Sequence, residues 1–268
     1  MRFFLSPLTL IVQQWVLLRR LTQREFEARY RGSVLGLAWA VIAPAAMMGI
    51  YTVVFFGILS SRWPGYADDR TAYALNLLAG LTVFNVAAEC LNRAPRLILE
   101  NPSYVKKLVF PVEILPVVAL MSASISAFFS GFVLLIFQVA LAEPPFLTIF
   151  LLPVLALPFL LFCLGASYLL AALGVFLRDI GQLTGPLVMA LMFLSPVFYA
   201  SDIVPLPWRA WLWLNPLAAT IEWVRGALFL GALPAAHQYF AQLALGILLL
   251  ALGYRVFMSL RPGFADVI

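Results

Sequence analysis

Two adjacent stretches of the chain carry no charged residue: ILPVVALMSASISAFFSGFVLLIFQVALA (Ile114–Ala142) and PPFLTIFLLPVLALPFLLFCLGASYLLAALGVFL (Pro144–Leu177). Only Glu143 separates them. A helix needs about 20 mostly apolar residues to cross about 30 Å of hydrocarbon, and both stretches exceed that length. Both are continuously apolar, whereas the strands of a membrane barrel alternate in units of about ten residues. The two stretches therefore predict membrane-spanning helices.

The composition of the whole chain agrees with a membrane protein. Hydrophobic residues make up 64% of the 268 residues and charged residues only 11%, whereas soluble domains carry about 25% charged residues. About a quarter of the surface of a 300-residue unfolded chain stays exposed after folding, so a soluble fold could not hide this much apolar surface. The composition argues against a soluble enzyme, and the aromatic content of 14% argues against a disordered chain.

Charge-free runs elsewhere predict further spans, and we expect an all-α membrane protein with one transmembrane domain over residues 1–268. Six spans are expected, over residues 34–60, 71–89, 114–141, 146–176, 180–200 and 239–258. Residues 1–30 should form an amphipathic interface helix, because apolar residues recur at steps of three and four between Phe4 and Leu18.

Residues 202–233 are expected to form re-entrant helices before the last span. A seventh span there would be broken at Asn215–Pro216 and would contain Glu222 and Arg225. Irregular backbone at membrane depth is tolerated where protein or a cavity surrounds it. The tryptophans of this stretch also suit the membrane interface.

The basic residues predict the orientation of the chain. With six spans, 13 of the 17 basic residues fall on the side of the two termini. Cytoplasmic loops carry an excess of lysine and arginine, so both termini are expected in the cytoplasm. The 13 residues are Arg2, Arg19, Arg20, Arg24, Arg29, Arg31, Arg93, Arg96, Lys106, Lys107, Arg178, Arg255 and Arg261. Because the charge lies on one membrane face, the net charge of +5 does not indicate a nucleic-acid partner.

Motifs for catalysis or nucleotide binding are absent from the sequence. It contains no GxxxxGK[ST] phosphate loop, no HExxH and no GxSxG. The two cysteines, Cys90 and Cys163, lie far apart in or beside apolar segments, and His237 is the only histidine. We expect no metal site, no bound cofactor and no catalytic activity in this chain, and we expect the cysteines to be buried.

An ordered set of segments resembles the permease subunits of polysaccharide-exporting ABC transporters. The resemblance covers about Arg24 to Gly231 and is closest to the O-antigen and teichoic-acid exporters, with capsule exporters a more distant match. Its pieces are Arg29–Ser33 with Leu35, Gly36, Trp39, Pro44 and Tyr51; Leu99–Pro102, Tyr104–Lys107 and Phe110–Pro116; Phe176–Ile180; Ser195–Tyr199; and Asn215–Pro216 followed by Arg225.

The resemblance implies that transport and ATP hydrolysis are carried out by different subunits. Such a subunit forms a homodimer, and two separate ATPase subunits carry the ATP and Mg²⁺. The assembly moves a lipid-linked polysaccharide from the cytoplasm across the bacterial inner membrane. The absence of a phosphate loop in this chain agrees with that arrangement.

Candidate sites follow from the resemblance and the charges. Arg24, Arg29 and Arg31 are expected to bind the pyrophosphate of the lipid, with general membrane anchoring as the alternative. The segment from Arg96 to Lys107 is expected to hold a short helix that contacts the ATPase, an ordinary basic loop being the alternative. Its candidate residues are Arg96, Asn101, Tyr104, Lys106 and Lys107.

Aromatic residues could line a passage for a sugar polymer, since their faces offer apolar contact without tight hydrogen bonds. Packing or lipid contact is the alternative for each of them. Glu222 and Arg225, three residues apart, would be neighbours on one helical turn, as either a functional or a stabilising pair. The aromatic candidates are Trp39, Tyr51, Phe55, Phe84, Tyr199 and Trp208.

Three other functions stay open at this point. The chain could be a capsule or teichoic-acid exporter permease, or an ABC permease for a small molecule. It could also be a membrane enzyme acting on a lipid-linked glycan. The acidic residues on the outer side show no catalytic spacing, which counts against the enzyme.

Overall fold

The computed structural model describes residues 9, 12–58, 60, 63–64, 69–105, 110–141 and 146–267. Its elements are helical, which confirms the expected all-α fold. The first part of the expected interface helix lies outside the described residues. The main helices are α2 (Trp15–Tyr30), α3 (Trp39–Tyr51), α4 (Arg70–Arg93), α5 (Pro102–Val105), α6 (Ile114–Leu141), α7 (Leu152–Phe176), α8 (Ile180–Leu194), α9 (Leu206–Leu212), α10 (Pro216–Arg225), α11 (Ala236–Leu260) and α12 (Phe264–Val267).

Five helical segments of the described chain are long and apolar enough to cross a membrane. Short 3₁₀ or π turns extend several of the main helices within these segments. They confirm a multi-pass membrane protein, and the total of six crossings stays a prediction. The segments are Gly36–Ile58, Arg70–Arg96, Ile114–Leu141, Leu147–Phe176 and Ala236–Val267.

The helix in the expected fifth span is shorter than the expected range of 180–200. Helix α8 ends at Leu194, and its 15 residues extend about 22 Å. Ser195 leaves the helical conformation with φ −113° and ψ 150°. Pro196 follows it, and the α region is disfavoured for a residue before proline. Residues 195–200 then form turns that lead toward α9 and α10.

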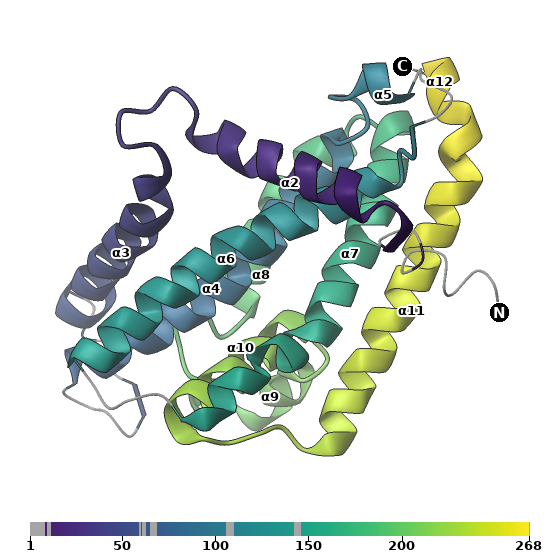
Figure 1. The fold of residues 1–268 in the computed structure, drawn as a ribbon. Coiled ribbons are helices and arrows are strands. Elements are labelled where there is room, and N and C mark those ends of the chain that lie inside the picture. Colours follow the sequence, from purple (N-terminus) through teal and green to yellow (C-terminus); the bar gives the residue numbers. More distant parts are fainter. Residues whose placement is uncertain are drawn as a thin grey trace.

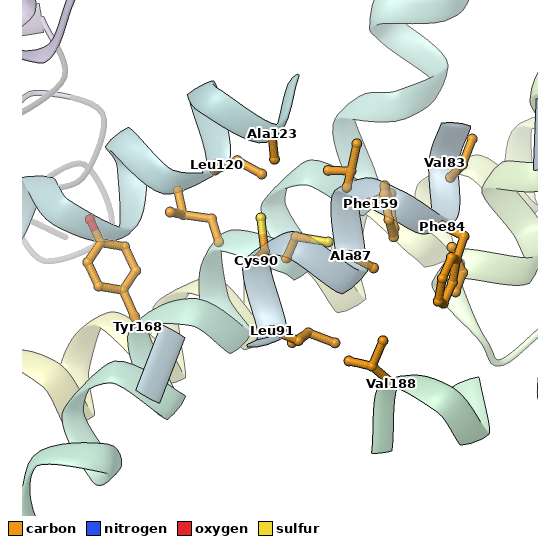
Figure 2. Close-up of a cluster of buried hydrophobic side chains, with 14 of the residues drawn as sticks. Val83, Phe84, Ala87, Cys90, Leu91, Leu120, Ala123, Phe159, Tyr168 and Val188 are labelled. Atoms are coloured by element: carbon orange, nitrogen blue, oxygen red, sulfur yellow. The ribbon is translucent and has the colours of Figure 1, made fainter. Parts of the chain in front are cut away.

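Helix α4 forms the centre of the core. In the most apolar 18-residue stretch of the segment that contains α4, 72% of the residues are buried. The corresponding stretch of Gly36–Ile58 has only 11% of its residues buried. Figure 2 shows side chains of α4 meeting those of the surrounding helices α6, α7 and α8. Cys90 and Cys163 are both free and buried, as expected from the sequence. The labelled core residues are Val83, Phe84, Ala87, Cys90, Leu91, Leu120, Ala123, Phe159, Tyr168 and Val188.

The two ends of the bundle differ in what they carry. Helices α5 and α12 and the C-terminus lie together at one end, and α2 crosses the bundle near it (Figure 1). Helices α9 and α10 lie toward the opposite end (Figure 1). Asn215 caps α10 by accepting a hydrogen bond from the amide of Leu217 (3.0 Å), and Pro216 occupies the first helical position.

Candidate functional site

Helix α2 is joined to α4 and α6 by a network of charged side chains. Arg29 donates to Glu89 through both terminal nitrogens, with Nη1 2.9 Å from Oε2. Arg29 Nη1 also donates to the Ser126 hydroxyl (2.7 Å). Arg93 lies 2.6 Å from Glu25 and 3.7 Å from Glu89. Two arginines and two glutamates thus balance each other where α2 meets the core.

The three expected pyrophosphate ligands have different surroundings. Arg29 already holds a carboxylate in the two-point geometry that it would offer a phosphate, so a phosphate would have to displace Glu89. Arg24 Nη2 donates to the hydroxyl of Tyr104 (2.8 Å). Arg31 is exposed and has no side-chain partner within the described residues. Of the three, Arg31 is the guanidinium left open to a ligand.

We expect Arg29 and Glu89 to stabilise the fold as a pair. In a double-mutant cycle of Arg29→Gln and Glu89→Gln, we expect a coupling energy of about 1 kcal/mol, near the upper end for exposed pairs. The value is at that end because Glu89 is only 18% exposed. Thermal unfolding in detergent measures it, with Arg31→Gln as the control that leaves stability unchanged. A coupling energy near zero would contradict a structural role for the pair.

A polar groove of about 360 Å³ opens beside this network, between α2, α4 and α6. Helix α4 contributes Asn85, Glu89 and Asn92, which share one helical face because they are spaced by four and three residues. Ser126 and Ser130 on α6, four residues apart, line the groove from the other side. The groove is therefore lined by amides, hydroxyls and paired charges, with Val86 and three alanines between them, within two otherwise apolar spans.

The expected coupling segment contains the short helix α5 directly after Asn101. Asn101 donates from its side chain to the carbonyl of Leu97 (2.9 Å). The ring of Tyr104 stacks on Phe110 with centroids 4.3 Å apart, while its hydroxyl accepts from Arg24. Arg96 is exposed, and Lys106 and Lys107 lie outside the described residues. The structure thus brings Arg24 and Tyr104, expected in two separate sites, into one contact.

The C-terminal end of the chain packs at the end of the bundle where α5 lies (Figure 1). Arg261 Nη1 lies 3.1 Å from Glu113 Oε2, just before α6 begins. The backbone carbonyl of Glu113 accepts from the Tyr168 hydroxyl (2.9 Å) on α7. Phe264 is buried against Phe176 and Phe257. These contacts hold α12 against α7 and α11, at the end of the bundle where Figure 1 also shows α5.

Arg225 pairs with Glu222, as expected, and is also the centre of a larger buried cluster. Its guanidinium donates to three backbone carbonyls, those of Asn76 (3.0 Å), Pro196 (2.6 Å) and Val197 (2.9 Å). Glu222 accepts from it at 3.2 Å. The guanidinium carbon lies 4.4 Å from the ring centroid of Trp63, in cation–π geometry. Arg225 therefore links α10, α4 and the turn after α8, which indicates a structural role.

The six aromatic candidates separate into three settings. Tyr51 and Phe55 pack against Phe198, and Phe84 is buried in the core. Trp39 is exposed at the start of α3. Tyr199 and Trp208 line an apolar cavity of about 830 Å³, together with Trp211 and other residues of α4 and α7 to α11. The structure therefore does not gather the six residues along one surface.

Comparison with known proteins identifies the family. A family model described as "ABC-2 type transporter" matches residues 16–229, which is most of the chain. The chain belongs to the ABC-2 type transporter family. As a member of this family it is a membrane transport subunit, which sets aside the alternative of a membrane enzyme.

Relatives of this ABC-2 family member match over nearly their whole length. The "O-antigen export system permease protein RfbA" of Klebsiella pneumoniae is 26% identical over 250 residues, covering 92% of this chain and 93% of the relative. A protein of the same name from Myxococcus xanthus is 28% identical over 254 residues, covering 94% and 95%. The resemblance expected from the sequence is confirmed.

Sequence reasoning missed the polar groove and the partners of the arginines. The groove has a readable signal, since Asn85, Glu89 and Asn92 recur at helical spacing at the end of an apolar run. The partners of Arg225 have none, because Asn76 is 149 residues away in sequence.

Proposed function

We propose that this chain is the transmembrane subunit of an ABC exporter that moves a lipid-linked polysaccharide of the O-antigen type out of the cytoplasm. The supporting observation is the match, over more than 90% of each chain, to permeases named for O-antigen export. Capsule and teichoic-acid exporters are the nearest alternatives, and a small-molecule permease is a more distant one.

The energy for transport would come from a separate chain. Because no phosphate loop occurs in the sequence, two partner subunits would bind ATP and Mg²⁺. Two copies of the present chain would form the passage. We place this homodimer in the bacterial inner membrane.

The end of the bundle that carries α2, α5 and α12 would face the cytoplasm. Basic residues are concentrated at this end, including Arg19, Arg20, Arg96, Arg255 and Arg261. An ATPase would therefore meet α5 and the residues after it, Lys106 and Lys107. Helix α5 is linked to α2 through Tyr104 and Arg24, and α2 to α4 through Arg29 and Glu89. A movement of α5 would thus reach the core through a short chain of polar contacts.

Co-purification tests the proposal. We expect this chain to co-purify from its host with an ATPase subunit, as a complex of two copies of each. ATP hydrolysis by that complex in lipid nanodiscs should rise when the host's lipid-linked glycan is added. Absence of an ATPase partner, or equal hydrolysis with and without glycan, would contradict the proposal.

A charge-reversed variant provides the internal control. Lys106→Glu combined with Lys107→Glu should leave the amount of folded permease unchanged but weaken the bound ATPase or its response to glycan. The reason is that cytoplasmic loop charges contribute to partner recognition more than to membrane packing. If this variant binds the ATPase normally and glycan stimulates its ATP hydrolysis normally, the two lysines do not contribute to coupling.

A further inference from the structure

Some polar side chains of the groove between α2, α4 and α6 make no contact that holds the helices together. Asn85, Asn92 and Ser130 line it without a side-chain hydrogen-bond partner among the described residues. Asn85 and Asn92 are also exposed. Asn85 is eight residues from Arg93, which places it about 12 Å further along α4. Polar side chains at membrane depth face protein, water or a polar ligand, since hydrocarbon offers no hydrogen bonds.

The charges around the groove favour a neutral ligand over an anion. Arg29 and Arg93 are paired with Glu89 and Glu25. The carboxylate of Glu89 itself lines the groove and would repel a phosphate. A phosphate site would instead present unpaired arginines. The groove is thus unlike the pyrophosphate site expected from the sequence.

The remaining polar groups match the chemistry of a sugar. Asparagine amides both donate and accept, and serine hydroxyls do the same. Sugar hydroxyls also donate and accept, so each can form hydrogen bonds with the asparagine and serine side chains of the groove. The volume of about 360 Å³ is at the lower end of small-ligand sites, about 300–1,000 Å³. A lipid tail would leave the amides and hydroxyls unpaired.

We propose that this groove binds a neutral sugar unit of the exported glycan on the side of the membrane where α2 lies. The assignment rests on the proposed function, because it takes the glycan as the transported substrate. Asn85 and Asn92 of α4 and Ser130 of α6 are its recognition residues. Glu89 lies between Asn85 and Asn92 along α4, and both arginines that line the groove, Arg29 and Arg93, are paired with glutamates.

The test compares two lipids on the permease–ATPase complex in nanodiscs. One is the host's oligosaccharide linked to its lipid pyrophosphate, and the other is the same lipid pyrophosphate without sugar. In the variant Asn85→Leu/Asn92→Leu, we expect about tenfold more of the sugar-bearing lipid to be needed for half-maximal ATP hydrolysis, as for two lost hydrogen bonds. The response to the sugar-free lipid should match that of the unmodified complex. Asn85→Gln/Asn92→Gln should restore much of the response, and Gln182→Leu, an exposed site on α8 outside the groove, is the matched control.

A second measurement does not depend on hydrolysis. A cysteine introduced by Asn85→Cys should react with a maleimide more slowly when the sugar-bearing lipid is present, and at an unchanged rate with the sugar-free lipid. The natural cysteines are buried and give a low background. Equal protection by both lipids would assign the groove to the lipid head and overturn the proposal, as would no protection by either. Protection without stimulated hydrolysis would support the groove while counting against the proposed transport function.

Discussion

Replacing Arg225 with leucine is expected to leave little folded permease. Three backbone carbonyls, those of Asn76, Pro196 and Val197, would lose their charged donor in a buried site. Each orphaned group costs about 1–3 kcal/mol, and we expect a total loss of about 3–5 kcal/mol. Leucine also cannot replace the cation–π contact with Trp63. The amount of monodisperse protein in detergent and its thermal unfolding temperature measure the effect.

The shape of the guanidinium accounts for much of this expected loss. Arginine offers five donors in a planar fork, whereas lysine offers one compact ammonium group. Arg225→Lys should therefore recover only part of the stability. Gly80→Ala should also destabilise, since a Cβ at Gly80 would lie 2.7 Å from Arg225 Nη2 and 3.1 Å from the carbonyl oxygen of Val197.

A surface arginine provides the control. Arg209 pairs with Asp202, and that aspartate side chain is 69% exposed. Arg209→Gln should change stability little, because exposed ion pairs contribute about 0–1 kcal/mol. If Arg225→Leu were as stable as Arg209→Gln, the carbonyl contacts of Arg225 would not be structural.

Replacing Gly253 with leucine should separate α7 from α11. A Cβ at Gly253 would overlap the carbonyl oxygen of Gly165, and one at Gly246 would overlap that of Pro158. The neighbouring atoms belong to backbone and cannot move aside as a side chain can. Overpacking usually costs about 1–3 kcal/mol, so we expect the upper end of that range or more. Small residues allow this close approach of helices in a membrane.

The expected series for the glycines is graded. Gly253→Ala should destabilise less than Gly253→Leu, as judged by the thermal unfolding temperature. Gly131→Ala in α6 is the matched control, since a Cβ there meets nothing within 4 Å. Alanine favours helix by up to about 1 kcal/mol over glycine, so this control should be neutral or stabilising. Equal behaviour of Gly253→Ala and Gly131→Ala would mean that α7 and α11 do not pack as closely as described.

Several features of the fold could be predicted because they depend on local sequence. Apolar runs such as Ile114–Ala142 are long enough to span a membrane whatever surrounds them. Asn215–Pro216 interrupts a helix through local sterics alone, and α10 does begin at Pro216. Helix α8 is shorter than the apolar run predicts, because hydropathy continues past Ser195 although the backbone leaves the helical conformation there, before Pro196.

The candidate sites were less predictable, because their meaning depends on what each side chain meets. The sequence places Arg29 among basic residues near the membrane surface, but its side chain pairs with Glu89, 60 residues further along the chain. Tyr104 belongs to the segment that the family resemblance predicts to contact the ATPase, and its contact with Arg24 has no signal in the sequence.

The sequence by itself determined that this protein is an all-helical membrane protein, and its motifs pointed to an ABC exporter permease. The length of an apolar run and the positions of the charged residues are properties of the sequence alone, so they are known without the fold. Only the tertiary structure decided that Arg225 holds three segments together, that Gly253 allows two helices to touch, and that Asn85 and Ser130 share a groove. These pairings depend on which helical faces meet, and in a membrane that is set by close packing and buried hydrogen bonds rather than by hydrophobicity alone.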